Sequence, residues 1–164
     1  MLLLAWASWT LTRLRRLAGR VRRSREVLDA ALLRRAELAA ALARERPADL
    51  GEDLGPALAA AAREARAPAA GDREAAENAL GRLLRRVPER LVTPELADAG
   101  MRVALARRFY NDAVRDTGAL RRRRLTRVLR LHARRPLPRY FDIDDGLDAV
   151  LAGSAPAGGP QRGR

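Results

Sequence analysis

The sequence predicts an all-α protein, an antiparallel four-helix bundle with long first and last helices in up-down-up-down order. One observation is composition: the apolar residues are mostly Ala and Leu, and only six residues are aromatic, which is typical of closely packed helices. The other is periodicity, because apolar residues recur at spacings of three and four over residues 14–42 and again over 93–132. A chain of 164 residues is expected to form one domain with a substantial core.

Residues 1–13 are predicted to form an apolar anchor segment. The stretch MLLLAWASWTL is apolar for about eleven residues and then meets several arginines. It is shorter than the roughly 20 residues that cross a bilayer, and its charges follow the apolar part, unlike those of a signal peptide. Three alternatives remain: a start site inside a longer anchor, a helix that enters one leaflet with Trp6 and Trp9 at the interface, or an extension of the bundle core.

The first helix of the body begins at residue 14, and Pro47 ends it. Nine positions alternate steps of three and four: Leu14, Leu17, Val21, Ser24, Leu28, Ala31, Arg35, Leu38 and Leu42. This heptad pattern predicts a seam that packs against other helices. Polar residues at such positions tend to fix the register of packing, so Arg35 is interpreted as a structural specifier and not as a ligand.

The middle of the chain is predicted to hold a loop and two shorter helices. Prolines, glycines and acidic residues over 47–56 indicate a loop, and an alanine-rich helix is expected over 57–66. Asp72 is a good cap for a third helix that reaches Val87 and is stopped by Pro88.

The last helix is predicted to start at Thr93, whose hydroxyl can cap it, with Pro94 at its first position. One stripe of this helix is expected to be buried, with Tyr110 at its centre: Val103, Ala106, Tyr110, Ala113, Thr117 and Leu120. The bundle is expected over residues 14–135, a Pro-rich and acidic closing segment over 136–153, and a disordered tail over 154–164.

Three stretches carry a family resemblance. The segment ALARRFYNDAVRDTGAL over 104–120, with its arginine, two aromatics, Asn and Asp, resembles the last helix of the LemA family. LDAALLRRAEL over 28–38 and LPRYFDID over 137–144 are similar to the family's first helix and its close. The residues that carry the motif are Arg34, Arg35, Arg107, Tyr110, Asn111 and Asp112. The chain departs from the family at Ala40, Ala41 and Gly118, where the family has Pro, Asn and Asn.

The resemblance implies a helical bundle with an amino-terminal membrane anchor that continues into the first helix. It implies no settled biochemical activity. A role as a membrane-associated scaffold or interaction protein is therefore the expected function.

Sequence patterns for catalysis and metal binding are absent. Serine occurs only at Ser8, Ser24 and Ser154, the one histidine is His132, and there is no cysteine or lysine, which argues against a catalytic triad, a zinc site and a P-loop. The acidic cluster Asp142, Asp144, Asp145 and Asp148 does not fit a calcium loop, because Gly146 and Gly153 stand where ligands are required. We therefore expect no enzyme, no metal and no cofactor, and interpret the cluster as a solvated turn or helix cap.

The net charge of +13 is unevenly distributed. Residues 1–46 carry 11 arginines against 4 acidic residues and 101–139 carry 13 against 2, whereas 47–100 carry 7 against 10 and 140–164 carry 2 against 4. In an antiparallel bundle both basic stretches meet at the end nearest the anchor. The arginines expected to contact an anionic lipid surface there are Arg121, Arg122, Arg123, Arg124, Arg127 and Arg130.

Two other interpretations of this charge remain. The arginines can be an ordinary solvated face that reflects a GC-rich genome, or the chain can be a soluble basic protein that binds nucleic acid. The second is the less favoured function, because the chain has no recognised nucleic-acid motif and no aromatics interleaved with its basic runs. Arginine next to an apolar segment is retained in the cytoplasm, so we expect the bundle on the cytoplasmic side of the cell membrane. The sequence identifies neither a protein partner nor an oligomeric state.

Overall fold

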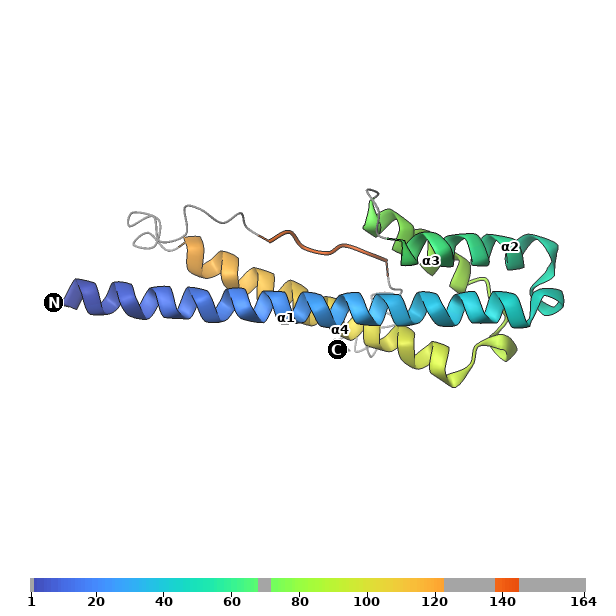
Figure 1. Ribbon diagram of the computed structural model, residues 1–164, viewed down its shortest axis with the longest axis horizontal. Coiled ribbons are helices and arrows are strands. Elements are labelled where there is room, and N and C mark those ends of the chain that lie inside the picture. Colours follow the sequence, from blue (N-terminus) through green and yellow to red (C-terminus); the bar gives the residue numbers. More distant parts are fainter. Residues whose placement is uncertain (1, 68–71, 123–137, 145–164) are drawn as a thin grey trace, which may run out of the picture.

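The structure is a computed structural model that describes residues 2–67, 72–122 and 138–144, with residues 2–7, 10, 11, 14 and 121 described only as backbone. The helices are α1 (Leu2–Glu45), α2 (Pro47–Arg66), α3 (Arg73–Leu84) and α4 (Pro94–Arg122), with a short 3-10 helix, η1 (Glu89–Leu91), before α4. Within these ranges there is no strand, so the predicted all-α class is confirmed. The first and last helices are the longest, as expected (Figure 1).

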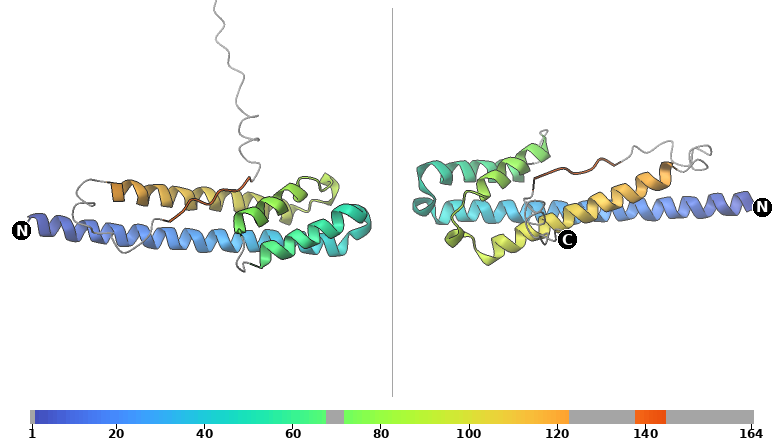
Figure 2. Two further views of the ribbon diagram at one scale, coloured as in Figure 1. Left: turned by 90° about the horizontal axis from the view of Figure 1, so that it is seen from above. Right: turned by 180° about the vertical axis from the view of Figure 1, so that it is seen from behind.

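The long helices α1 and α4 lie side by side in opposite directions. Arg20 of α1 pairs with Asp116 of α4 over 3.2 Å, and the guanidinium carbon of Arg25 lies 5.6 Å from the centre of the Tyr110 ring. At 1.5 Å per residue the 44 residues of α1 extend about 66 Å. The amino-terminal part of α1 therefore reaches beyond Arg122, the last described residue of α4 (Figures 1 and 2).

The shorter helices cover the carboxyl-terminal half of α1. Helix α2 folds back along α1, and α3 then runs in the same direction as α1 (Figure 1). Two ion pairs show this direction, since Arg73 meets Asp29 at 3.1 Å and Glu77 meets Arg35 at 2.8 Å.

The loop predicted over 47–56 is wrong, because α2 already begins at Pro47. Pro47 occupies the first turn, where its missing N–H costs nothing. Gly51 has φ 77° and ψ 173° and kinks the helix. Leu50 and Leu54, on either side of the kink, are both buried. The glycine and prolines that suggested a loop thus start and bend a helix whose leucines hold it against α1.

Both predicted caps are confirmed. One carboxylate oxygen of Asp72 accepts from the backbone N–H groups of Glu74 at 3.0 Å and Ala75 at 3.2 Å. The hydroxyl of Thr93 accepts from the Leu96 N–H at 3.2 Å. Helix α3 ends at Leu84, three residues before the predicted Val87.

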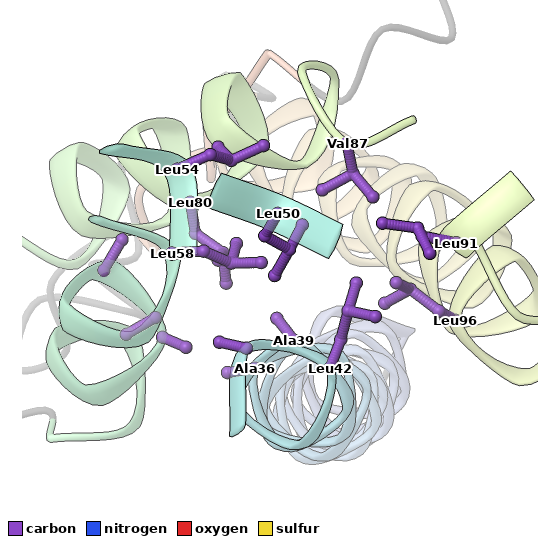
Figure 3. Close-up of a cluster of buried hydrophobic side chains, with 14 residues drawn as sticks. Ala36, Ala39, Leu42, Leu50, Leu54, Leu58, Leu80, Val87, Leu91 and Leu96 are labelled. Atoms are coloured by element: carbon purple, nitrogen blue, oxygen red, sulfur yellow. The ribbon is translucent and has the colours of Figure 1, made fainter. Parts of the chain in front are cut away.

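The core consists of two clusters along α1. The first joins the carboxyl-terminal half of α1 to α2, α3, η1 and the start of α4. Its side chains converge as Figure 3 shows: Ala36, Ala39, Leu42, Leu50, Leu58, Leu80, Leu91 and Leu96 among others. The second joins the middle of α1 to the middle of α4 and to residues 141 and 143, with Leu28, Leu32, Val103, Tyr110, Phe141 and Ile143.

The seam predicted on α1 is found in part, because Leu17, Ser24, Ala31 and Leu38 are only half-buried. Val21, Leu28, Arg35 and Leu42 are buried at intervals of seven. Leu32, Ala36, Ala39 and Ala43, which the heptad does not include, are buried as well. The reason is that α1 packs against α2 on one flank and α4 on the other, so a second stripe is covered.

Candidate functional site

The family-motif residues do not gather in one place. Arg34 is exposed and lies 3.8 Å from Glu37 on its own helix, whereas Arg35 is buried. On α4, Asp112 pairs with Arg115 at 2.8 Å and Arg107 is half-buried. Tyr110 is buried as predicted. Tyr110 and Asn111 both form hydrogen bonds to a distant part of the chain.

That distant part is residues 138–144, called here the closing strap, an extended stretch that runs from beside α4 toward α3 (Figure 1). The Asn111 side-chain amide binds both backbone groups of Phe141, donating to its carbonyl oxygen at 3.0 Å and accepting from its N–H at 2.9 Å. The Tyr110 hydroxyl donates to the Arg139 carbonyl oxygen at 2.8 Å. The backbone N–H and C=O groups of an extended segment need hydrogen-bond partners when no neighbouring strand supplies them. Here Tyr110 and Asn111, which are adjacent on α4, supply them.

Helix α3 binds the other half of the strap. Glu74 accepts the N–H of Asp142 at 3.0 Å, and the Asn78 side-chain oxygen accepts that of Asp144 at 2.8 Å. Arg85 donates to the Asp144 carbonyl oxygen at 3.3 Å and lies 3.0 Å from its carboxylate. The strap therefore fastens α3 to α4.

The strap's side chains alternate as in a β-strand. Phe141 and Ile143 are buried, whereas Tyr140, Asp142 and Asp144 are exposed. The acidic residues Asp142 and Asp144 thus belong to an extended segment and not to the predicted turn or cap, while Asp145 and Asp148 lie outside the described residues. The alternation of YFDID is visible in the sequence and could have predicted an extended segment with two buried positions.

Arg25 of α1 lies beside the aromatic rings of Tyr110 and Phe141. Its guanidinium carbon lies 5.1 Å from the Phe141 ring centre and 5.6 Å from that of Tyr110, distances at which a cation is attracted to an aromatic face. The same side chain pairs with Asp29 at 3.2 Å, and Asp29 also pairs with Arg73 at 3.1 Å. Arg25 and Asp29 of α1 therefore connect α1 to α3, α4 and the strap.

Arg35 and Glu77 form a buried ion pair between α1 and α3. Their side chains are 7% and 0% exposed, and an Arg35 nitrogen lies 2.8 Å from a Glu77 oxygen. Burial raises the pKa of Glu77 above its usual 4.5, and the hydrogen bond from Arg35 opposes that rise. Within the part of the chain that the structure describes, the second Glu77 oxygen and the Arg35 Nε have no hydrogen-bond partner. This geometry agrees with the interpretation of Arg35 as a structural residue.

The basic end is the end of the molecule that holds the amino-terminal part of α1 and the carboxyl-terminal part of α4. Arg13, Arg15, Arg16, Arg20, Arg22 and Arg23 of α1 and Arg122 of α4 are exposed there. Of the predicted lipid contacts, Arg121 is described as backbone only, and Arg123, Arg124, Arg127 and Arg130 lie outside the described residues.

A notch lies between the two helices at this end. It has a volume of about 350 Å³ and is lined by Arg13, Leu17, Arg20, Asp116, Ala119 and Leu120. The guanidinium of Arg13 lies over the ring of Trp9 at 5.4 Å. The lining thus combines two guanidiniums and one carboxylate with three apolar side chains.

The described residues were also compared with the requirements for metal binding and for spanning a membrane. They contain no group of three or more acidic, histidine or cysteine residues placed to hold a metal ion. No helix within the same ranges combines the length and the apolar character needed to cross a membrane.

Comparison with the models of known families gives no match for this chain, and comparisons with curated proteins and with solved structures give none. The LemA resemblance therefore stays a prediction based on the three motifs.

Proposed function

We propose that this protein is a membrane-associated helical scaffold of the LemA type, with no catalytic activity of its own. In this proposal residues 2–11 enter the membrane, the basic end faces anionic headgroups, and the rest of the bundle binds an unidentified protein partner on the cytoplasmic side. The ion pair between Arg20 and Asp116 supports the proposal, because it sets the carboxyl-terminal part of α4, which ends at the exposed Arg122, beside the arginines of α1.

The charge at that end favours an anionic surface. Six exposed arginines lie between residues 13 and 23, directly after the apolar segment. Each basic residue near an anionic membrane contributes on the order of 1 kcal/mol to binding, and the attraction falls off within about 8 Å at physiological salt. Arginines close to the apolar segment gain most from this attraction, because they are held at the surface.

Fractionation of cells tests the membrane association. We expect the full-length protein to sediment with membranes, to resist nuclease and high salt, and to be released by detergent. Release by nuclease and salt would instead favour the nucleic-acid function. Recovery of the protein in the soluble fraction without any of these treatments would contradict both the membrane and the nucleic-acid function.

Cysteine labelling tests the orientation. The chain has no cysteine, so Asp53→Cys places a single thiol on an exposed position of α2, far from the apolar segment. We expect an impermeant maleimide to label it only after lysis, because arginines beside a membrane segment are retained in the cytoplasm. Labelling in intact cells would reverse the proposed orientation.

A further inference from the structure

The notch at the basic end has the features of a headgroup site. Arg13 and Arg20 are seven residues apart, about two helical turns, so they project from the same face of α1 with Leu17 between them. Asp116, Ala119 and Leu120 of α4 form the facing wall. The notch therefore offers two guanidiniums on one side and small apolar surfaces beside them.

The charges in the notch are unequal. Arg20 pairs with Asp116 at 3.2 Å, and both side chains are about half exposed, 52% and 46%. Arg13 lies over the Trp9 ring at 5.4 Å. Two guanidiniums against one carboxylate leave the lining of the notch with a net positive charge, and a half-exposed ion pair is weak enough for a stronger anion to replace.

The position of the notch matches the level of lipid headgroups. Beyond Arg13, α1 continues as the apolar residues 2–11, which extend about 15 Å at 1.5 Å per residue. This is half of the roughly 30 Å hydrocarbon core of a bilayer. When the apolar segment enters one leaflet, as the proposed function requires, Arg13 lies at the boundary between hydrocarbon and headgroups.

We propose that this notch binds the phosphate of an anionic lipid headgroup, with Arg13 and Arg20 as its two ligands. Guanidinium groups bind phosphate oxygens through paired, charge-assisted hydrogen bonds. Leu17, Ala119 and Leu120 form the apolar part of the lining beside the two guanidiniums. Asp116 competes with the phosphate for Arg20, so a doubly charged phosphomonoester is bound more tightly than a singly charged diester.

The test uses the full-length protein in neutral detergent micelles, where there is no charged surface to mask a specific site. The probes are dioleoyl phosphatidic acid, phosphatidylglycerol and phosphatidylcholine, and native mass spectrometry measures the fraction of protein that retains each lipid. We expect retention in the order phosphatidic acid, phosphatidylglycerol, phosphatidylcholine. In Arg13→Gln/Arg20→Gln, retention of phosphatidic acid should fall about fivefold or more, the equivalent of losing about one basic contact.

A matched control lies on the same helix. Arg15 and Arg22 have the same spacing of seven, both are exposed, and Arg22 lies 3.8 Å from Glu26 much as Arg20 lies near Asp116. They project from the opposite face of α1, about 180° away. Arg15→Gln/Arg22→Gln should therefore keep the order of retention, whereas Asp116→Asn should increase retention of phosphatidic acid because the competing carboxylate is gone.

Equal loss in the two double variants, or unchanged retention in Arg13→Gln/Arg20→Gln, would overturn the site. Circular dichroism separates loss of the site from loss of folding, and the gain expected for Asp116→Asn cannot arise from unfolding. Failure of the proposed function is a different outcome, since it would appear as solubility in the fractionation experiment whatever the micelles show.

Discussion

Asn111 binds both backbone groups of Phe141, although 30 positions separate them in the sequence. The same amide thus donates at 3.0 Å and accepts at 2.9 Å, and a carboxylate could perform only the second task. This reciprocal pair holds the Phe141 ring in the second core cluster.

Replacement of Asn111 by Asp tests that relationship. The variant loses the donor to the Phe141 carbonyl and places a negative charge beside it, so we expect the free energy of unfolding to fall by about 1–3 kcal/mol. Asn78→Asp is the matched control, because the Asn78 side-chain oxygen accepts the Asp144 N–H, a task that a carboxylate keeps. Urea denaturation measures the free energy of unfolding of both variants. Equal losses in the two variants would show that the hydrogen bond donated by Asn111 contributes little.

Two substitutions of Tyr110 separate its packing from its hydroxyl. Tyr110→Phe removes the 2.8 Å bond to the Arg139 carbonyl and should cost about 1 kcal/mol. Tyr110→Ala also removes a ring that is only 6% exposed and should cost about 3 kcal/mol or more. The difference between the two unfolding free energies measures the ring; a loss below half a kcal/mol for Tyr110→Ala would mean that the α4 stripe is misassigned.

The buried ion pair predicts that substitutions of Arg35 and Glu77 have strongly non-additive effects on the free energy of unfolding. Arg35→Met alone leaves the Glu77 carboxylate buried without its partner, which should cost about 3–5 kcal/mol. Arg35→Met/Glu77→Met removes both charges, and we expect it to recover most of that loss. Chemical denaturation of the single and double variants forms the test, and additive losses would contradict the pairing.

The raised pKa of Glu77 predicts the sign of a pH effect. Between its usual 4.5 and the raised value, the native state holds more protons at Glu77 than the unfolded state does, so this group favours folding as the pH falls through that window. Above the window its burial as an anion opposes folding. The stability of the native protein minus that of Arg35→Met/Glu77→Met should therefore rise from neutral pH toward 4.5; a constant or falling difference would contradict the direction of the shift.

Two glycines should respond in opposite ways to alanine. Nothing lies within 4 Å of a Cβ added at Gly100, which is inside α4, so Gly100→Ala should stabilise the protein by about 0.5–1 kcal/mol. Gly51 has φ 77°, which an L side chain rarely adopts, and Gly51→Ala should destabilise it by about 1 kcal/mol. Thermal unfolding measures both, and a loss at Gly100 would indicate a contact that the geometry does not show.

The helices could be predicted from local signals because their apolar spacing and caps are local. Asp72 and Thr93 cap helices as expected, since an acceptor side chain before a free N–H acts within three residues. The start of α2 was missed because proline and glycine are equally compatible with a loop and with a helix start and kink. Only the burial of Leu50 and Leu54 decides between them, and burial depends on where α1 lies.

The partners of the strap could not be predicted from the sequence for a similar reason. Asn111 and Asn78 are polar residues on helices, and nothing near them in sequence indicates that their partners are 30 and 66 positions away. Tyr110 was predicted to be buried from its stripe, but the bond to Arg139 depends on the strap's return. Glu77 likewise reads as an exposed helical acid until α3 is placed against Arg35.

The strap follows its binding partners in the sequence, which determines when it can bind them during synthesis. Its partners on α3 and α4 precede it by 29 to 68 positions, so they leave the ribosome well before the residues that bind them. Chains emerge amino terminus first, so Tyr110 and Asn111 leave the ribosome while they still have no strap to bind. A nascent chain stopped before Arg139 would therefore keep an open seam beside Tyr110 and Asn111 that chaperones and proteases can recognise.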